Sequence, residues 1–87
     1  MKMREEQIIE ALKEYLVPKL PKNQSEVVLT PDLPLIQAGL IDSLELFKLI
    51  NFIEKQFEIK IGPNEIVLSN FETLAAIQKL VESKLGG

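Results

Sequence analysis

The chain has 87 residues, 46% of them hydrophobic, and ten basic against thirteen acidic residues give it a net charge of −3. This length predicts a single domain spanning 1–87. The absence of cysteine and histidine excludes disulfides, Cys/His zinc sites, thiol nucleophiles and Ser-His catalysis. The chain has no basic run and no membrane-length apolar stretch, and its first six residues do not resemble the apolar region of a signal peptide. We therefore expect a cytoplasmic protein that binds neither nucleic acid nor membrane.

The first predicted element is a helix over residues 5–17. Apolar side chains recur there with helical spacing at Ile8, Ile9, Leu12, Tyr15 and Leu16. Pro18 and Pro21 end it, because proline cannot continue the helical hydrogen-bond ladder. Residues 18–41 hold four of the five prolines and show no periodicity, which predicts a long loop that packs across the helices. Residues 27–29 could form a short strand, but the rest of the chain offers it no partner.

The second predicted helix begins at Asp42, whose side chain is placed to cap it, with Glu45 completing a capping box. Its core face is formed by Leu46, Leu49, Ile50, Ile53 and Phe57. Pro63 opens a short helix that continues to about Val67. A second capping box, Ser69 with Glu72, predicts the start of the last helix. The apolar stripe of that helix is Phe71, Leu74, Ile77, Leu80 and Val81.

Two large apolar residues of the second helix do not fit its core face. Leu44 and Phe47 fall on the outer side, and Leu44 shares that side with Lys48, Asn51 and Lys55. On spacing alone, we expect that the long loop covers these residues, and the alternative is that they form a contact surface. Ser43, beside them at the helix start, has no base available to activate it as a nucleophile, which argues against a small hydrolase.

The segment Ala38-Gly39-Leu40-Ile41-Asp42-Ser43-Leu44 resembles the modification site of the acyl and peptidyl carrier protein family. The resemblance covers nearly the whole chain. It includes residues 54–61, at the end of the second helix, and residues 70–74, at the start of the last helix. It implies an all-α fold, a four-helix acyl-carrier-like bundle with a long loop between the first two helices and a short third helix.

The resemblance also implies a function. Ser43 would accept 4′-phosphopantetheine from coenzyme A, transferred by a separate phosphopantetheinyl transferase that supplies the base and the magnesium. Gly39 and Asp42 would shape the motif and be recognised with it, and Leu44, Glu45, Phe47 and Lys48 would form the surface that partner enzymes contact. The thiol of the arm would hold an intermediate as a thioester, loaded by an acyl- or aminoacyl-transferring enzyme and passed to downstream enzymes. The chain would then be a monomeric carrier with no catalytic residue and no metal site.

Two departures from fatty-acid carriers keep the cargo open. Lys48 occupies a position where such carriers commonly have an acid, and Gln37 replaces an acid often found before the glycine. The residues of the motif resemble those of stand-alone carriers from nonribosomal-peptide, D-alanine-ligase or polyketide systems. The alternatives to an acyl carrier are therefore an aminoacyl, peptidyl or D-alanyl carrier, and an unmodified helical interaction domain.

Overall fold

The computed structural model describes residues 5–19 and 29–86, and within these ranges it contains helices and no strand. The α-helices are α1 (Glu5–Leu16), α2 (Ser43–Phe57), α3 (Leu68–Phe71) and α4 (Leu74–Gly86), with 3₁₀ turns at Val17–Lys19 and Pro63–Glu65. The predicted all-α, four-helix architecture with a short third helix is confirmed. Among the residues described, no helix has the length and apolar character needed to span a bilayer.

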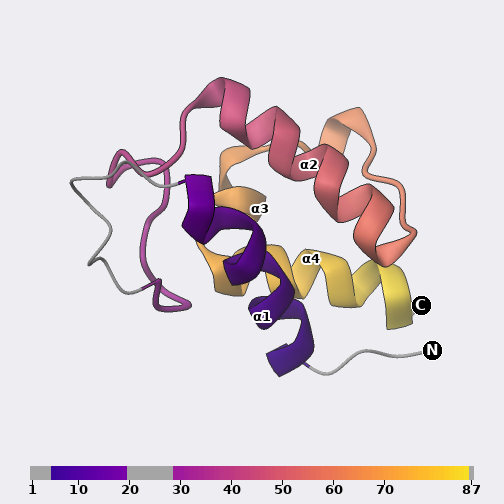
Figure 1. Ribbon diagram of the computed structural model, residues 1–87. Helices are drawn as coiled ribbons and strands as arrows, with labels where there is room; N and C mark the ends of the chain where they lie inside the picture. Colours follow the sequence, from indigo (N-terminus) through magenta and orange to yellow (C-terminus); the bar gives the residue numbers. More distant parts are fainter. Residues whose placement is uncertain (1–4, 20–28, 87) are drawn as a thin grey trace.

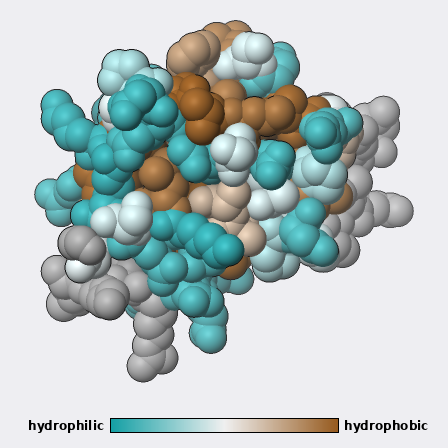
Figure 2. Space-filling view, turned by 180° about the vertical axis from the view of Figure 1, so that it is seen from behind, coloured by the Kyte–Doolittle hydropathy of each residue, from teal (hydrophilic) through white to brown (hydrophobic). Residues whose placement is uncertain are grey.

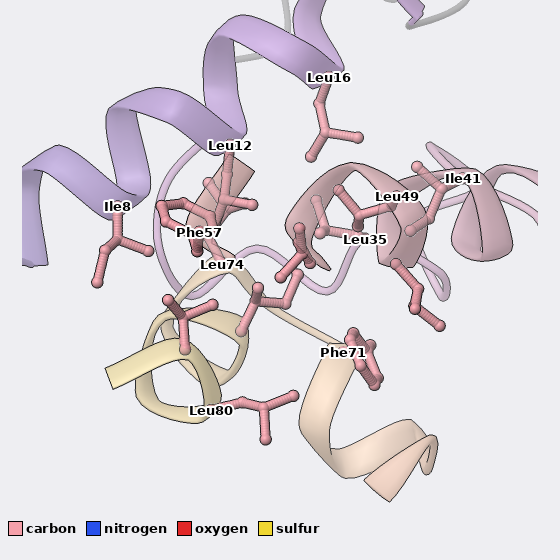
Figure 3. Packing of buried hydrophobic residues seen from close by; sticks show 14 of the residues in the cluster. Ile8, Leu12, Leu16, Leu35, Ile41, Leu49, Phe57, Phe71, Leu74 and Leu80 are labelled. Atoms are coloured by element: carbon pink, nitrogen blue, oxygen red, sulfur yellow. The ribbon is translucent and has the colours of Figure 1, made fainter. Parts of the chain in front are cut away.

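The helices enclose one hydrophobic core. In Figure 1, α1 lies in front of α4, and α2 runs above them. Figure 3 shows Ile8, Leu12 and Leu16 on one face of α1, pointing into the cluster formed with side chains of α2, the loop and α4. The predicted core residues of the helices are buried, except Ile9, Tyr15 and Leu46, which are partly buried against the cluster. The helical periodicity therefore identified the core correctly.

The long loop is part of this core, as predicted. Leu29, Leu35, Leu40 and Ile41 are all buried. Two backbone hydrogen bonds attach the loop to the junction of α3 and α4: the N–H of Leu35 donates to the carbonyl of Glu72 over 2.8 Å, and the N–H of Ala75 donates to the carbonyl of Pro31 over 2.9 Å. Residues 27 and 28 of the candidate strand lie outside the described residues. The described part of the loop is thus fixed to the core and to the α3–α4 junction before the chain enters α2.

Two predicted helix boundaries are wrong. The helix expected from Pro63 to Val67 is only a 3₁₀ turn, Pro63–Glu65, and the short third helix follows it at Leu68–Phe71. Ser69 lies inside that third helix and does not cap α4. The cap is Thr73, whose Oγ1 accepts a hydrogen bond from the N–H of Ala76 at 3.0 Å. The bonds from the loop explain the break, because Glu72 uses its carbonyl for Leu35 and Ala75 uses its N–H for Pro31.

Candidate functional site

A tight turn leads the chain into α2. The N–H of Ala38 donates to the carbonyl of Pro34 over 2.8 Å, and that of Gly39 donates to the carbonyl of Ile36 over 3.0 Å. Gly39 has a φ of +77°, a conformation that other residues rarely adopt. A Cβ at this position would meet no atom within 4 Å, so the backbone angle rather than space calls for glycine. Directly after the turn, the buried Leu40 and Ile41 anchor the chain before it reaches Asp42.

Asp42 caps α2 as predicted. Its backbone is extended, and its Oδ1 accepts a hydrogen bond from the N–H of Glu45 at 2.9 Å. The reciprocal half of the predicted capping box is absent, since the described hydrogen bonds include none from the N–H of Asp42 to the Glu45 side chain. Instead, Oε1 of Glu45 lies 3.8 Å from Nζ of Lys48, and its Oε2 is buried without a hydrogen-bond partner. Asp42 therefore fixes the helix start by itself.

Ser43 is the first residue of this 15-residue helix, and it is exposed. Its N–H and that of Leu44 have no acceptor within the helix, because the first N–H groups of any helix lack one. Together with the helix dipole, these groups favour a negatively charged substituent beside the Ser43 hydroxyl. An exposed hydroxyl at a helix N-terminus thus fits a phosphodiester in chemistry and in access. Among the described residues no cluster of acidic side chains is placed to hold a metal ion.

The apolar residues beside Ser43 face solvent. The side chains of Leu44 and Phe47 are 62% and 57% exposed, so the expectation that the loop covers them is wrong. Val67 and Leu68, which precede and begin α3, are exposed as well. Figure 2 shows hydrophobic surface gathered in a band across the upper part of one face, at the height of α2. The exposed side chains of Leu44 and Phe47 are therefore available for contact.

An aromatic stack joins α1 to α2 near this surface, and the sequence did not reveal it. The rings of Tyr15 and Phe52 are stacked with centroids 4.2 Å apart, and Nζ of Lys19 lies 4.8 Å from the Tyr15 centroid. Burial raises the pKa of the Tyr15 phenol, the charge of Glu45 raises it further, and Lys48 opposes the rise. Tyr15 thus lies close to the Glu45–Lys48 pair. Only its helical spacing was visible in the sequence, and that indicated a core position.

The predicted site residues form one continuous region. Gly39, Asp42 and Ser43 follow one another from the turn into the helix, and Leu44, Glu45, Phe47 and Lys48 occupy the first two turns of α2. A groove of about 440 Å³ lies elsewhere, lined by Ser69 of α3, by Thr73 at the α3–α4 junction and by residues of α4 that include Lys79. The site is therefore a projecting helix end that presents a hydroxyl, and it is not a pocket that encloses a substrate.

Fold and site together define a small all-α domain that displays one serine at the start of its second helix. The sequence matches the family described as "Phosphopantetheine attachment site" over residues 10–81, and the chain belongs to this family. It is also 33% identical over 49 residues to a protein described as "Probable acyl carrier protein PigG" from Serratia sp. (strain ATCC 39006). That match covers 56% of this chain and 56% of the relative. The chain is thus a carrier domain for covalently attached 4′-phosphopantetheine.

Proposed function

We propose that the phosphopantetheine is attached to Ser43 and that the chain, as a single domain over 1–87, acts as an acyl carrier protein. The observation that carries this assignment is the exposure of Ser43 as the first residue of α2, between the Asp42 cap and exposed apolar side chains. The match to the attachment-site family includes this segment. The relative described as a probable acyl carrier protein supports the carrier role.

Attachment requires little of the chain itself. The Ser43 oxygen forms a bond to the phosphorus next to the pantetheine of coenzyme A, and the pyrophosphate bond to the adenylate breaks. The hydroxyl proton passes to a base of the transferase, and adenosine 3′,5′-bisphosphate leaves. The helix N-terminus stabilises the resulting phosphodiester anion. The chain contributes a presented hydroxyl and no catalytic group, which agrees with its lack of histidine and cysteine.

The bound arm ends in a thiol, which holds the intermediate as a thioester. A carrier with no cysteine offers this thioester no competing thiol of its own. The partners are a phosphopantetheinyl transferase, a loading ligase or transferase, and the enzymes that process the loaded intermediate. We expect the protein to work as a monomer in the cytoplasm and to catalyse no step itself.

The test is the intact mass of the protein after incubation with coenzyme A and a broad-specificity phosphopantetheinyl transferase. The wild type should gain the mass of one phosphopantetheine. Ser43→Ala should gain none and keep its fold, because Asp42 and not Ser43 provides the cap. Ser69→Ala, which removes another exposed serine, is the matched control and should be modified like the wild type. An unmodified wild type would favour the alternative of a helical interaction domain, and a modified Ser43→Ala would refute the site.

A further inference from the structure

The outward face of α2 is apolar where it begins and positively charged further along. Leu44, Lys48, Asn51 and Lys55 recur at helical spacing on this face, and all of them are exposed. Phe47 borders the face beside Leu44 and is 57% exposed. Lys48 and Lys55 are seven residues apart, which places them on the same side of the helix and about 10 Å apart along its axis.

Oε1 of Glu45 lies 3.8 Å from Nζ of Lys48, but the acidic side chains of α2 balance these lysines only in part at the surface. Glu45 has a side chain only 27% exposed, against 53% for Lys48, and one of its carboxylate oxygens is fully buried. Glu54 is half-buried, and its Oε2 accepts a hydrogen bond from the N–H of Ile61 at 2.9 Å. The exposed acids, Asp42 and Glu58, stand at the two ends of the helix. A chain with a net charge of −3 thus presents a positive middle on this face.

We propose that this face docks on a protein partner whose apolar pocket is bordered by carboxylates placed to meet Lys48 and Lys55. The pocket would receive Leu44 and Phe47, because central apolar anchors supply most of the affinity in such contacts. The carboxylates would set the orientation of the helix and speed the encounter. The proposal rests on the proposed function only in identifying the partner as an enzyme that acts on the arm of Ser43.

The experiment uses two synthetic helical peptides as probes. Both peptides have the same Leu and Phe residues on one face of the helix. One peptide carries Glu on both sides of that face, and the other carries Lys there. Each is titrated into the unmodified protein and followed by the backbone amide signals of α2 in NMR spectra. At roughly 0.02 M salt, we expect roughly three- to tenfold tighter binding of the Glu peptide, since two exposed ion pairs supply a preference of that size. The preference should shrink towards unity at roughly 0.5 M salt, because salt screens exposed charges.

Variants assign the preference to the two lysines. Lys48→Gln/Lys55→Gln should bind both peptides equally, and Lys48→Glu/Lys55→Glu should prefer the Lys peptide. The matched control, Lys13→Glu/Lys79→Glu, changes the net charge by the same amount on α1 and α4 and should keep the wild-type preference. Circular dichroism shows whether each variant keeps its helices, and the Gln pair remains a test if the Glu pair unfolds.

Two further outcomes would overturn the proposal. The first is equal affinity for the two peptides, including no detectable binding of either, or signal changes away from α2. The second is a shift of the α2 signals by vesicles of phosphatidylglycerol when neither peptide shifts them, because the face would then suit an anionic membrane. The titrations use protein without the arm, so their failure leaves the assignment of Ser43 untouched, and a failed modification assay leaves the docking proposal untouched.

Discussion

Three consecutive backbone features place one hydroxyl in solvent. The positive φ of Gly39 turns the chain, the buried side chains of Leu40 and Ile41 hold it, and Asp42 starts the helix. The turn at Gly39 and the cap at Asp42 follow from local chemistry, so the sequence was sufficient to predict them. The burial of Leu40 and Ile41 depends on the tertiary core and was not predicted. Glu45 is a further exception. Its spacing from Asp42 suggested a capping box, but its carboxylate lies against Lys48 and near Tyr15 of another helix.

The first prediction concerns the two roles of Asp42. Asp42→Ala should lower the free energy of unfolding by about 0.5–2 kcal/mol, because it removes the acceptor for the Glu45 N–H. Asp42→Asn keeps an acceptor and removes the charge, so it should cost a few tenths of a kcal/mol at most. Urea unfolding measures both values. The transferase should modify both variants more slowly than the wild type if it recognises the charge of Asp42. An equal loss of stability in the two variants would argue against the capping role of Asp42.

At the scale of the helices, the sequence predicted α2 better than α4. Asp42 caps α2 through an interaction within four residues, and a local pattern suffices to find it. The start of α4 depends instead on Leu35 and Pro31, which lie some 40 residues away and bond to the α3–α4 junction. No local pattern contains that information, and Ser69 with Glu72 has the same spacing as a true capping box. The stack of Tyr15 on Phe52 was missed for the same reason.

The second prediction tests the corrected start of α4. Thr73→Ala should lower the free energy of unfolding by about 1 kcal/mol, because Oγ1 of Thr73 accepts from the N–H of Ala76. Ser69→Ala should change it by less than about 0.5 kcal/mol, as exposed substitutions usually do. The two chemical denaturation curves decide between the caps, and the reverse order would restore Ser69 as the helix start.

The third prediction compares the two faces of α2. Ile53 is fully buried, and Ile53→Ala should cost about 2–5 kcal/mol. The double substitution Leu44→Ser/Phe47→Ser should leave the free energy of unfolding within about 1 kcal/mol of the wild type, since both side chains are exposed. The same double variant should lose thioester loading by the partner enzyme. A strongly destabilised double variant that loads normally per folded molecule would show that these residues pack inside the protein.

At the scale of the whole molecule, one core connects every element to the site. α1 contributes Ile8, Leu12 and Leu16, and the loop contributes Leu35 and Ile41, so the motif is fixed by the same cluster that holds the helices (Figure 3). Polar contacts hold the segment that follows α2 against α4. Glu65 pairs with Lys84 of α4 and accepts a hydrogen bond from the N–H of Gly62 at 2.8 Å. The Glu65–Lys84 pair joins distant parts of the chain and could not be derived from the sequence.

The fourth prediction concerns this pair and pH. The hydrogen bond from Lys84, and then that from the Gly62 N–H, hold the pKa of Glu65 below its ordinary value of 4.5. A carboxylate with a lowered pKa stabilises the fold above its unfolded-state pKa, and this contribution is lost as the pH falls through the folded-state pKa. The difference in Tm between the wild type and Glu65→Gln should therefore be positive at neutral pH and shrink below roughly pH 5. Lys84→Gln should show the same trend, and a difference that does not vary with pH would contradict the assignment.

The central claim is that Ser43, presented by α2, carries the arm, and fragmentation mass spectrometry of the modified protein tests it most directly. Trypsin releases residues 23–48 as one peptide, which contains Ser25 and Thr30 as well as Ser43. We predict that this peptide alone carries phosphopantetheine and that the fragment ions place it on Ser43. Fragment ions that place the arm on Ser25 or Thr30, or a modified peptide from elsewhere in the chain, would contradict the account.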